Sequence, residues 1–197
     1  MMMRTPFVEN ERFVIYSISD EDRDNYVELH RQLNGEQTLY LNPLSKDMLW
    51  EQTLHGTTNV YSIFTVDKDY CGSIELQKPE SKTPELGIDL LVNKRNKGIA
   101  SEVVPLFARK HYELKEIDYF WVRISSHNPH SKHVFEKLGA IKIGEEETEF
   151  QRFSERFKEI MEEQGQDIEN YRHLFGESDD EAVYRYKLAP SIFCKNI

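Results

Sequence analysis

The stretch Arg95-Asn96-Lys97-Gly98-Ile99-Ala100 lies between a strand-like run, residues 85–92, and a helical pattern that extends from Gly98 to Leu114. A strand that passes through a short, basic, glycine-containing turn into a helix leaves several backbone N–H groups unpaired and pointing at one place. Such a helix start binds phosphate, and Arg95 and Lys97 add positive charge to it. The stretch therefore predicts a site for a pyrophosphate-bearing ligand.

The composition indicates a globular protein rather than a membrane or disulfide-stabilised one. The chain has 197 residues, of which 39% are hydrophobic and 30% are charged, which is enough for one domain with a substantial core. No apolar run reaches the length of a membrane helix. The two cysteines, Cys71 and Cys194, make no disulfide framework, and Cys71 in a strand-like run is expected to be a buried thiol. We therefore expect a single cytoplasmic domain spanning residues 1–197, with no membrane partner.

The net charge of −10 is concentrated in one segment. Residues 145–181 hold 14 acidic and 4 basic residues, whereas the rest of the chain balances 21 against 21. Nucleic-acid binding through a basic surface is therefore not expected. Apolar residues recur at helical spacing within this segment, which predicts an acidic helical insert before the last strand. Its charged face is either plain solvated surface, a wall of a ligand site, or a contact in a homodimer.

Hydrophobic periodicity and turn residues predict an α+β domain with three layers. Capping residues and acidic first turns support the helix starts. The expected strands span residues 12–18, 60–66, 70–77, 85–92, 119–125, 140–144 and 182–188, and the expected helices span residues 20–33, 45–54, 98–114 and 128–138.

Four short segments carry a family resemblance: Glu85-Leu-Gly-Ile-Asp-Leu, the stretch from Arg95 to Glu102, Asn128-Pro-His-Ser131, and Lys137-Leu-Gly-Ala. Together they resemble the GNAT acetyltransferase superfamily, and best its RimJ/RimL-type branch, which acetylates protein N-termini. The resemblance covers roughly residues 10–190 and implies a mixed, mostly antiparallel sheet of six to seven strands flanked by helices. It also implies a V-shaped splay between strands 85–92 and 119–125 that holds acetyl-CoA.

The resemblance implies which residues would contact acetyl-CoA. The loop after strand 85–92 would cradle the pyrophosphate, although Asn96 stands where the family often has Gly. Asn adopts left-handed backbone angles more readily than most residues, so the turn is expected to form. A backbone N–H near Leu91 or Val92 would polarise the thioester carbonyl. The full set implied is Leu90, Leu91, Val92, Arg95, Asn96, Lys97, Gly98, Ile99, Ala100, Ser101, Asn128 and Ser131.

Acid–base chemistry is expected on the same strand, because the attacking amine must lose a proton. Alternation along the strand puts Glu85 and Asp89 on one face, which is unusual for a central strand. Glu85 matches the acid that often serves as base in the superfamily, or else is a surface acid at a strand end, and Asp89 is the second candidate. The family's tyrosine acid has no counterpart, since that position holds Phe135. Ser131 is the remaining candidate for relaying a proton to the thiolate.

The predicted function is transfer of an acetyl group from acetyl-CoA to a primary amine by direct attack on the thioester. The acceptor would be a protein N-terminus or a small cationic amine, because the acidic segment favours positive charge. The alternative is a non-catalytic module on the same fold that binds acyl-CoA or a partner protein. His127, His130 and His133 lie three residues apart, but no Cys or carboxylate cluster completes a metal site, so no metal is expected.

Overall fold

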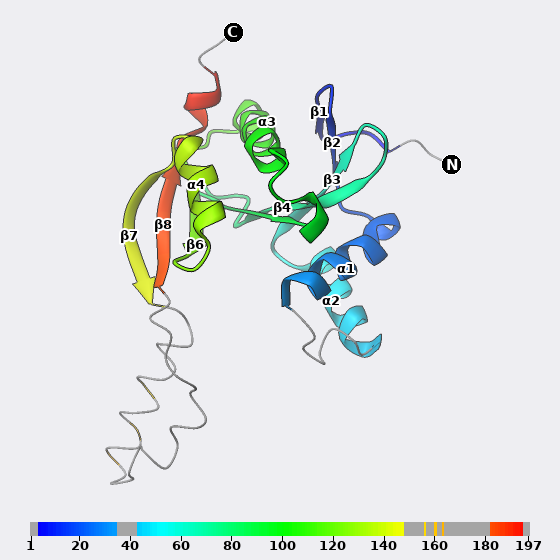
Figure 1. Cartoon of the computed structure of the whole chain (residues 1–197), viewed down its shortest axis with the longest axis horizontal. Coiled ribbons are helices and arrows are strands. Elements are labelled where there is room, and N and C mark those ends of the chain that lie inside the picture. Colours follow the sequence, from blue (N-terminus) through cyan, green and yellow to red (C-terminus); the bar gives the residue numbers. More distant parts are fainter. Residues whose placement is uncertain are drawn as a thin grey trace.

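The computed structural model describes residues 4–34, 43–147, 156, 160, 163 and 182–194, and Figure 1 labels their main strands and helices. The strands are β1 (Val8–Glu9), β2 (Phe13–Ser17), β3 (Asn59–Thr65), β4 (Tyr70–Gln77), β5 (Glu85–Leu90), β6 (Phe120–Ser125), β7 (Ile141–Glu147) and β8 (Ala182–Leu188). The helices are α1 (Arg23–Asn34), α2 (Pro43–His55), α3 (Ile99–Leu114) and α4 (Pro129–Lys137), with short 3-10 turns η1 (Asp20–Asp22), η3 (Val92–Lys94) and η5 (Pro190–Cys194).

The strands form one sheet in the order β1-β2-β3-β4-β5-β6-β8-β7. Every neighbouring pair is antiparallel except β5 and β6, which are parallel and share only one register pair, Glu85 with Trp121. Beyond that pair the two strands diverge. The mixed, mostly antiparallel sheet and the splay at this place are confirmed. The sheet has eight strands rather than six to seven, because Val8–Glu9 adds a short strand at one edge.

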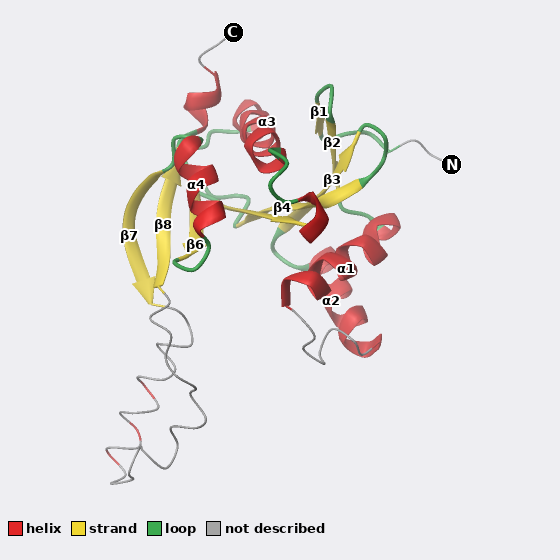
Figure 2. Cartoon of the chain, in the orientation of Figure 1, coloured by secondary structure: helices red, strands yellow, loops and turns green. Residues whose placement is uncertain are grey.

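Helices cover both faces of the sheet, with α3 and α4 on one side and α1 and α2 on the other (Figures 1 and 2). Alternation along β3 shows why. Tyr61 and Ile63 point into the main core, which α3 completes with Val103 and Phe107. Val60, one residue before Tyr61, points to the opposite face, where a smaller cluster holds Tyr26 of α1 and Trp50 of α2. The molecule thus has two apolar layers separated by the sheet.

Some element bounds differ from those expected. The strand predicted to reach residue 92 ends at Leu90, because the chain turns into η3 directly afterwards. The strand predicted at 140–144 continues to Glu147, so the first residues of the predicted insert belong to the sheet. The helix pair predicted within residues 145–181 otherwise falls almost entirely outside the described residues. Cys71 is buried, as expected. Among the described helices, none combines the length and the apolar character needed to cross a membrane.

Candidate active site

The divergence of β5 from β6 opens a cleft that consists of two adjoining cavities. One, here called the α3 cavity, has a volume of about 410 Å³ and lies against the start of α3. The other, here called the acidic cavity, has a volume of about 550 Å³ and lies between β4, β5, β6 and β7. The two cavities share five lining residues, namely Ile88, Asp89, Asn128, Ser131 and Phe135. Asp89 therefore stands where the two cavities join.

The α3 cavity is built around a helix start that suits an anion. Gly98 caps α3 with φ of 76°, in the left-handed region, and no atom lies within 4 Å of the place where a Cβ would stand. Asn96 also adopts a left-handed φ of 59°, so the turn forms with Asn as predicted. The open helix start presents unpaired backbone N–H groups with the positive end of the helix dipole. A diphosphate fits this chemistry.

Most of the residues implied as coenzyme contacts meet in the α3 cavity, and three do not. Leu91, Val92 and Lys97 belong to the same turn but do not line it. Leu33 of α1 and His130 of α4 line it without having been expected there. The implied residues that do line it are Leu90, Arg95, Asn96, Gly98, Ile99, Ala100, Ser101, Asn128 and Ser131.

The backbone edge of β5 that faces the cleft is shifted by one residue from the expected position. The Leu91 N–H donates to the Cys71 carbonyl oxygen of β4 at 3.0 Å, and the Val92 N–H donates to Gln32 Oε1 at 3.0 Å. Because backbone groups alternate sides along a strand, Leu90 turns its N–H and C=O away from β4. Consistently, the Leu90 carbonyl oxygen accepts a hydrogen bond from Arg95 Nε at 3.1 Å. By the same alternation Ile88 also turns its backbone groups away from β4, and of these two residues Leu90 is nearer to the turn that leads into α3.

The start of α4 forms the opposite wall. Asn128 caps the helix by accepting a hydrogen bond from the Ser131 backbone N–H at 3.0 Å, with Pro129 at the first helical position. Asn128 and Ser131 line both cavities, so the cap and the cleft contact occur together. Phe135 follows one turn later, is 2% exposed, and closes the cleft with an apolar ring.

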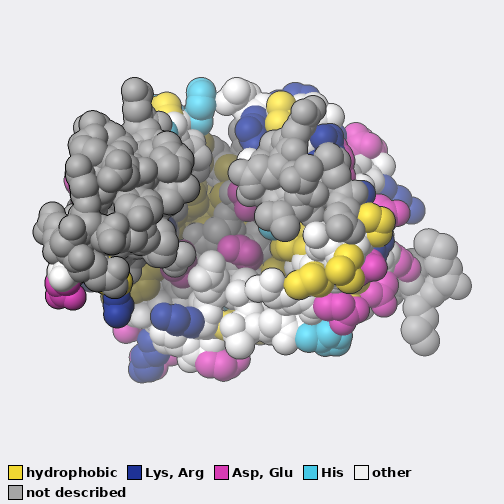
Figure 3. Space-filling view, turned by 90° about the horizontal axis from the view of Figure 1, so that it is seen from below, with side chains coloured by type: hydrophobic (Ala, Val, Ile, Leu, Met, Phe, Trp, Pro, Cys, Tyr) yellow, Lys and Arg dark blue, Asp and Glu magenta, His cyan; other side chains and the backbone are white. Residues whose placement is uncertain are grey.

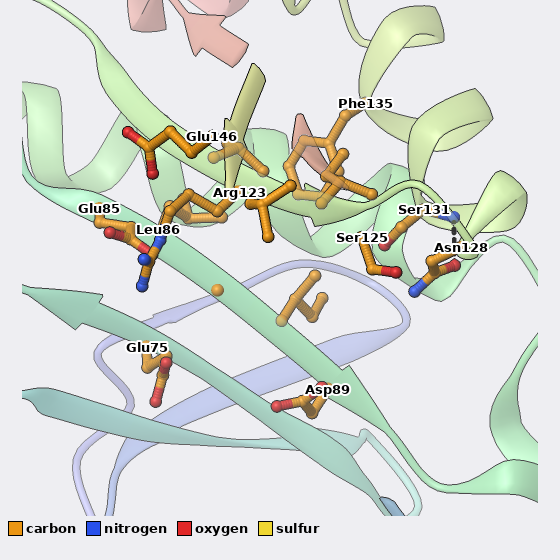
Figure 4. Close-up of a pocket in the computed structure, with 15 residues that line it drawn as sticks. Glu75, Glu85, Leu86, Asp89, Arg123, Ser125, Asn128, Ser131, Phe135 and Glu146 are labelled. Atoms are coloured by element: carbon orange, nitrogen blue, oxygen red, sulfur yellow. Dashed lines mark hydrogen bonds and ion pairs between the residues drawn. The ribbon is translucent and has the colours of Figure 1, made fainter. Parts of the chain in front are cut away.

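The acidic cavity is lined by four carboxylates and one guanidinium (Figure 4). Glu85 and Asp89 come from β5, Glu75 from β4 and Glu146 from β7, whereas Arg123 comes from β6. Figure 3 looks onto the molecule from below and shows acidic side chains within the hollow at its centre. This excess of negative charge favours a cationic ligand.

Two of the four carboxylates already carry a guanidinium partner. Glu85 Oε1 lies 2.7 Å from Arg123 Nε, across the single point where β5 pairs with β6. Glu146 Oε1 lies 2.8 Å from Arg185 Nη1, which joins β7 to β8. Glu85 lines the acidic cavity, and its carboxylate is held there by Arg123.

The other two carboxylates are more buried and have raised pKa values. Burial raises the pKa of Asp89, and the positive charge of Arg95 partly offsets this effect. Burial also raises the pKa of Glu75, partly offset by a hydrogen bond from Gln77, while the charges of Asp89 and Glu85 raise it further. Carboxyl groups with raised pKa values, gathered in a cleft, are candidates for exchanging a proton with a ligand.

Glu75 is the cleft residue that sequence reasoning missed. Its β4 strand reads as a buried apolar run in which Glu75 is the one acidic residue. An acidic residue inside such a run could have suggested a functional role. Its position in the cleft, however, depends on how β4 pairs with β5, and the sequence does not reveal that register. Arg123 and Ser125 were likewise not expected in the cleft, whereas Glu146 belongs to the acidic segment that was expected as a possible wall of a ligand site. Within the described part of the chain no cluster of three or more metal-ligating side chains occurs.

Comparison with known proteins agrees with this geometry. The family model described as "Acetyltransferase (GNAT) domain" matches residues 12–141, which include β2 to β6 and all four helices. No curated protein matches the sequence closely enough to count as a relative.

Among solved structures, the chain is similar to a spermidine N-acetyltransferase from Vibrio cholerae in complex with CoA and spermine. The TM-score is 0.66 and the identity 14%, over 94% of this chain and 100% of that one. A chimera of the Vibrio cholerae enzyme and hSSAT has a TM-score of 0.67 and 13% identity, over 93% and 98% of the two chains. At these identities the likeness establishes the shared fold.

Proposed function

The chain belongs to the GNAT family of acetyltransferases, and on that basis we propose that it acetylates a small polycationic amine of the polyamine class. As a member of this family it is an acyltransferase that uses acetyl-CoA as co-substrate. One observation carries the proposal for the acceptor: a cavity lined by four carboxylates joins the α3 cavity at Asp89. The spermine complex of the similar Vibrio cholerae enzyme supports the same acceptor class.

In this proposal the α3 cavity holds the coenzyme. Backbone N–H groups at the start of α3, with Arg95 beside them, bind the pyrophosphate. Gly98 lets the backbone approach the phosphates closely, because no side chain stands there. The exposed edge of β5 then guides the pantetheine arm along the cleft, as an added peptide strand would pair with a sheet edge. This places the thioester near Leu90 and Asp89.

The acidic cavity delivers the amine to the thioester carbon. Carboxylates attract the ammonium form, and Asp89 then accepts a proton from it, directly or through water, so that a neutral amine attacks. Asp89 is a better base than Glu85 here, because Glu85 is held by Arg123 at 2.7 Å. The proposal therefore prefers Asp89 to Glu85, the opposite of the order expected from the sequence.

The tetrahedral intermediate develops negative charge on the former carbonyl oxygen. The Leu90 N–H faces the cleft and is the donor we assign to this oxyanion, in place of Leu91 or Val92. When the C–S bond breaks, the nitrogen loses its second proton and the thiolate gains one, through solvent or through a relay by the Ser131 hydroxyl group, which gives up one proton and takes up another. Phe135 stands at the position where the family has tyrosine, but it has no ionisable group and so donates no proton to the thiolate.

The competing acceptor is a protein N-terminus, as the RimJ/RimL resemblance implies. A panel of acceptors separates the two: spermine, spermidine, butylamine, and peptides with free N-termini, each with acetyl-CoA while thiol release is recorded. We expect kcat/KM to be highest for the polyamines, since a cavity of four carboxylates favours several positive charges over one. Faster turnover of the peptides would assign the enzyme to the N-terminal branch. Coenzyme binding without turnover of any acceptor would favour a non-catalytic module.

A further inference from the structure

Gly87 and Glu75 form a matched pair on neighbouring strands. The register of β4 and β5 places them directly opposite each other. A Cβ at Gly87 would lie 3.0 Å from both Cγ and Oε1 of Glu75. The Glu75 side chain therefore lies over the backbone of Gly87, close to the place that a Cβ would take. Figure 4 shows Glu75 beside Glu85 and Asp89. The missing side chain at position 87 leaves Glu75 its present place, because a Cβ there would require the Glu75 side chain to shift by a few tenths of an ångström.

The position of Glu75 is central among the cleft acids. The same register puts Ser73 opposite Asp89 and Gln77 opposite Glu85, so Glu75 is the diagonal neighbour of both β5 acids. Gln77 Nε2 donates to Glu75 Oε1 at 3.4 Å, a long contact that leaves most of the carboxylate's accepting capacity unused. The carboxylate faces the acidic cavity, which it lines, and not the α3 cavity.

We propose that Glu75, seated over Gly87, is the residue that binds the ammonium group of the acceptor and holds it beside Asp89. Glu85 and Glu146 are less suited to this task because Arg123 and Arg185 already neutralise them at 2.7 and 2.8 Å. Gly87 is then a specificity position: it contributes no contact, but it allows the carboxylate to reach the cleft. The inference rests on the proposed function, because it requires an acceptor that carries positive charge.

Two substitutions probe the pair in different ways. Glu75→Gln keeps the shape and removes the charge, whereas Gly87→Ala keeps the charge and displaces the carboxylate. Glu80→Gln is the matched control, because Glu80 is exposed in the loop between β4 and β5 and does not line either cavity. All three variants leave the coenzyme side untouched, so the KM for acetyl-CoA and the melting temperature report whether the fold is intact.

With spermine as acceptor, we expect Glu75→Gln to raise the acceptor KM about tenfold or more, the usual scale for losing a charged hydrogen-bond partner. The KM for acetyl-CoA should stay unchanged. Gly87→Ala should raise the spermine KM in the same direction, and Glu80→Gln should not. Because Glu75 binds rather than reacts, kcat should fall much less than KM rises.

The possible results separate this inference from the proposed function. If the wild type acetylates spermine and Glu75→Gln leaves its KM unchanged, the assignment of Glu75 is overturned while the acceptor class stands. If the wild type binds acetyl-CoA but acetylates no polyamine, both are overturned. A fall in kcat at unchanged KM would also contradict the assignment, because it would make Glu75 a catalytic group. If Gly87→Ala does not fold, Glu75→Gln alone decides.

Discussion

Asp89 is the residue on which the proposed chemistry depends. It lines both the cavity that suits a diphosphate and the cavity that suits an amine. Its burial raises its pKa, with Arg95 opposing the shift, and this keeps a carboxylate that can accept a proton at the reacting centre. Both Asp89 and Glu85 are acids on β5, but Asp89 lines both cavities, whereas Glu85 lines only the acidic cavity.

We predict that Asp89→Asn lowers kcat about a hundredfold, the lower end of the effect of removing a general base. A base works only when deprotonated. In the wild type, kcat/KM should therefore fall as the pH drops through the raised pKa of Asp89, and Asp89→Asn should lose this acid limb. Rate profiles from pH 5 to 10 with spermine test this. An acid limb unchanged in Asp89→Asn but absent in Glu85→Gln would return the base role to Glu85.

The sequence predicted this site where a residue's role follows from its neighbours along the chain. Gly98, Asn96 and the Asn128 cap were placed correctly, because turn geometry and capping are local. The sequence placed the cleft-facing amide near Leu91 or Val92, whereas we propose Leu90, because a distant segment decides which side of the strand pairs with β4. Glu75 was missed for the same reason: the Glu75–Gly87 register links two strands.

At the scale of elements, the end of α1 contributes to one wall of the α3 cavity. Leu33 lines the α3 cavity and Gln32 accepts a hydrogen bond from the Val92 N–H, while Tyr26 packs beneath the helix against Trp50. The start of this helix is fixed by Asp22, which is 1% exposed and binds both guanidinium nitrogens of Arg4, at 2.7 and 2.8 Å. The N-terminal segment thereby sets where α1 lies over the sheet.

Arg4→Ala should lower the free energy of unfolding by about 3 kcal/mol, because it leaves the buried Asp22 carboxylate without its charge partner. Arg12→Ala is the control: Arg12 pairs with Glu102 on the surface, where its side chain is 58% exposed, and such pairs contribute about 1 kcal/mol or less. Urea denaturation of both variants measures the difference. Equal losses for the two would show that Arg4 does not anchor α1.

Helices and strands with strong local signals were predicted well, and tertiary effects account for the differences. Helices α3 and α4 begin directly after their caps Gly98 and Asn128, and the turn η1 that leads into α1 begins after Ser19. The β5 strand stops at Leu90 because the chain bends there into η3, whose residues Val92 to Lys94 have no turn signature that separates them from the strand. The two-residue β1 is too short for any periodicity, and it exists only because β2 offers it an edge.

At the scale of the whole molecule, charge links the sequence to the proposed acceptor. The net charge is −10, and the described part of the acidic segment, β7, contributes Glu146 to the cleft. The idea that the segment walls the acceptor site is thus supported at that one residue. The predicted helix pair and the rest of the segment lie outside the described residues, so their role stays a prediction.

Long-range attraction by this charge should depend on salt. At 0.15 M ionic strength, charges more than about 8 Å apart are largely screened. We expect kcat/KM for spermine to fall clearly between 20 and 300 mM KCl, and kcat/KM for butylamine to change much less, because steering scales with the ligand's charge. Steady-state rates across this range test the idea. Parallel curves for the two amines would contradict electrostatic steering.

A competition assay tests the central claim most directly. The enzyme is incubated with isotopically labelled acetyl-CoA and an equimolar mixture of spermine and a peptide with a free N-terminus, and the products are weighed by mass spectrometry. A polyamine-specific acidic cleft predicts that the labelled acetyl group is found on spermine. Label on the peptide N-terminus, with spermine unmodified, would contradict it.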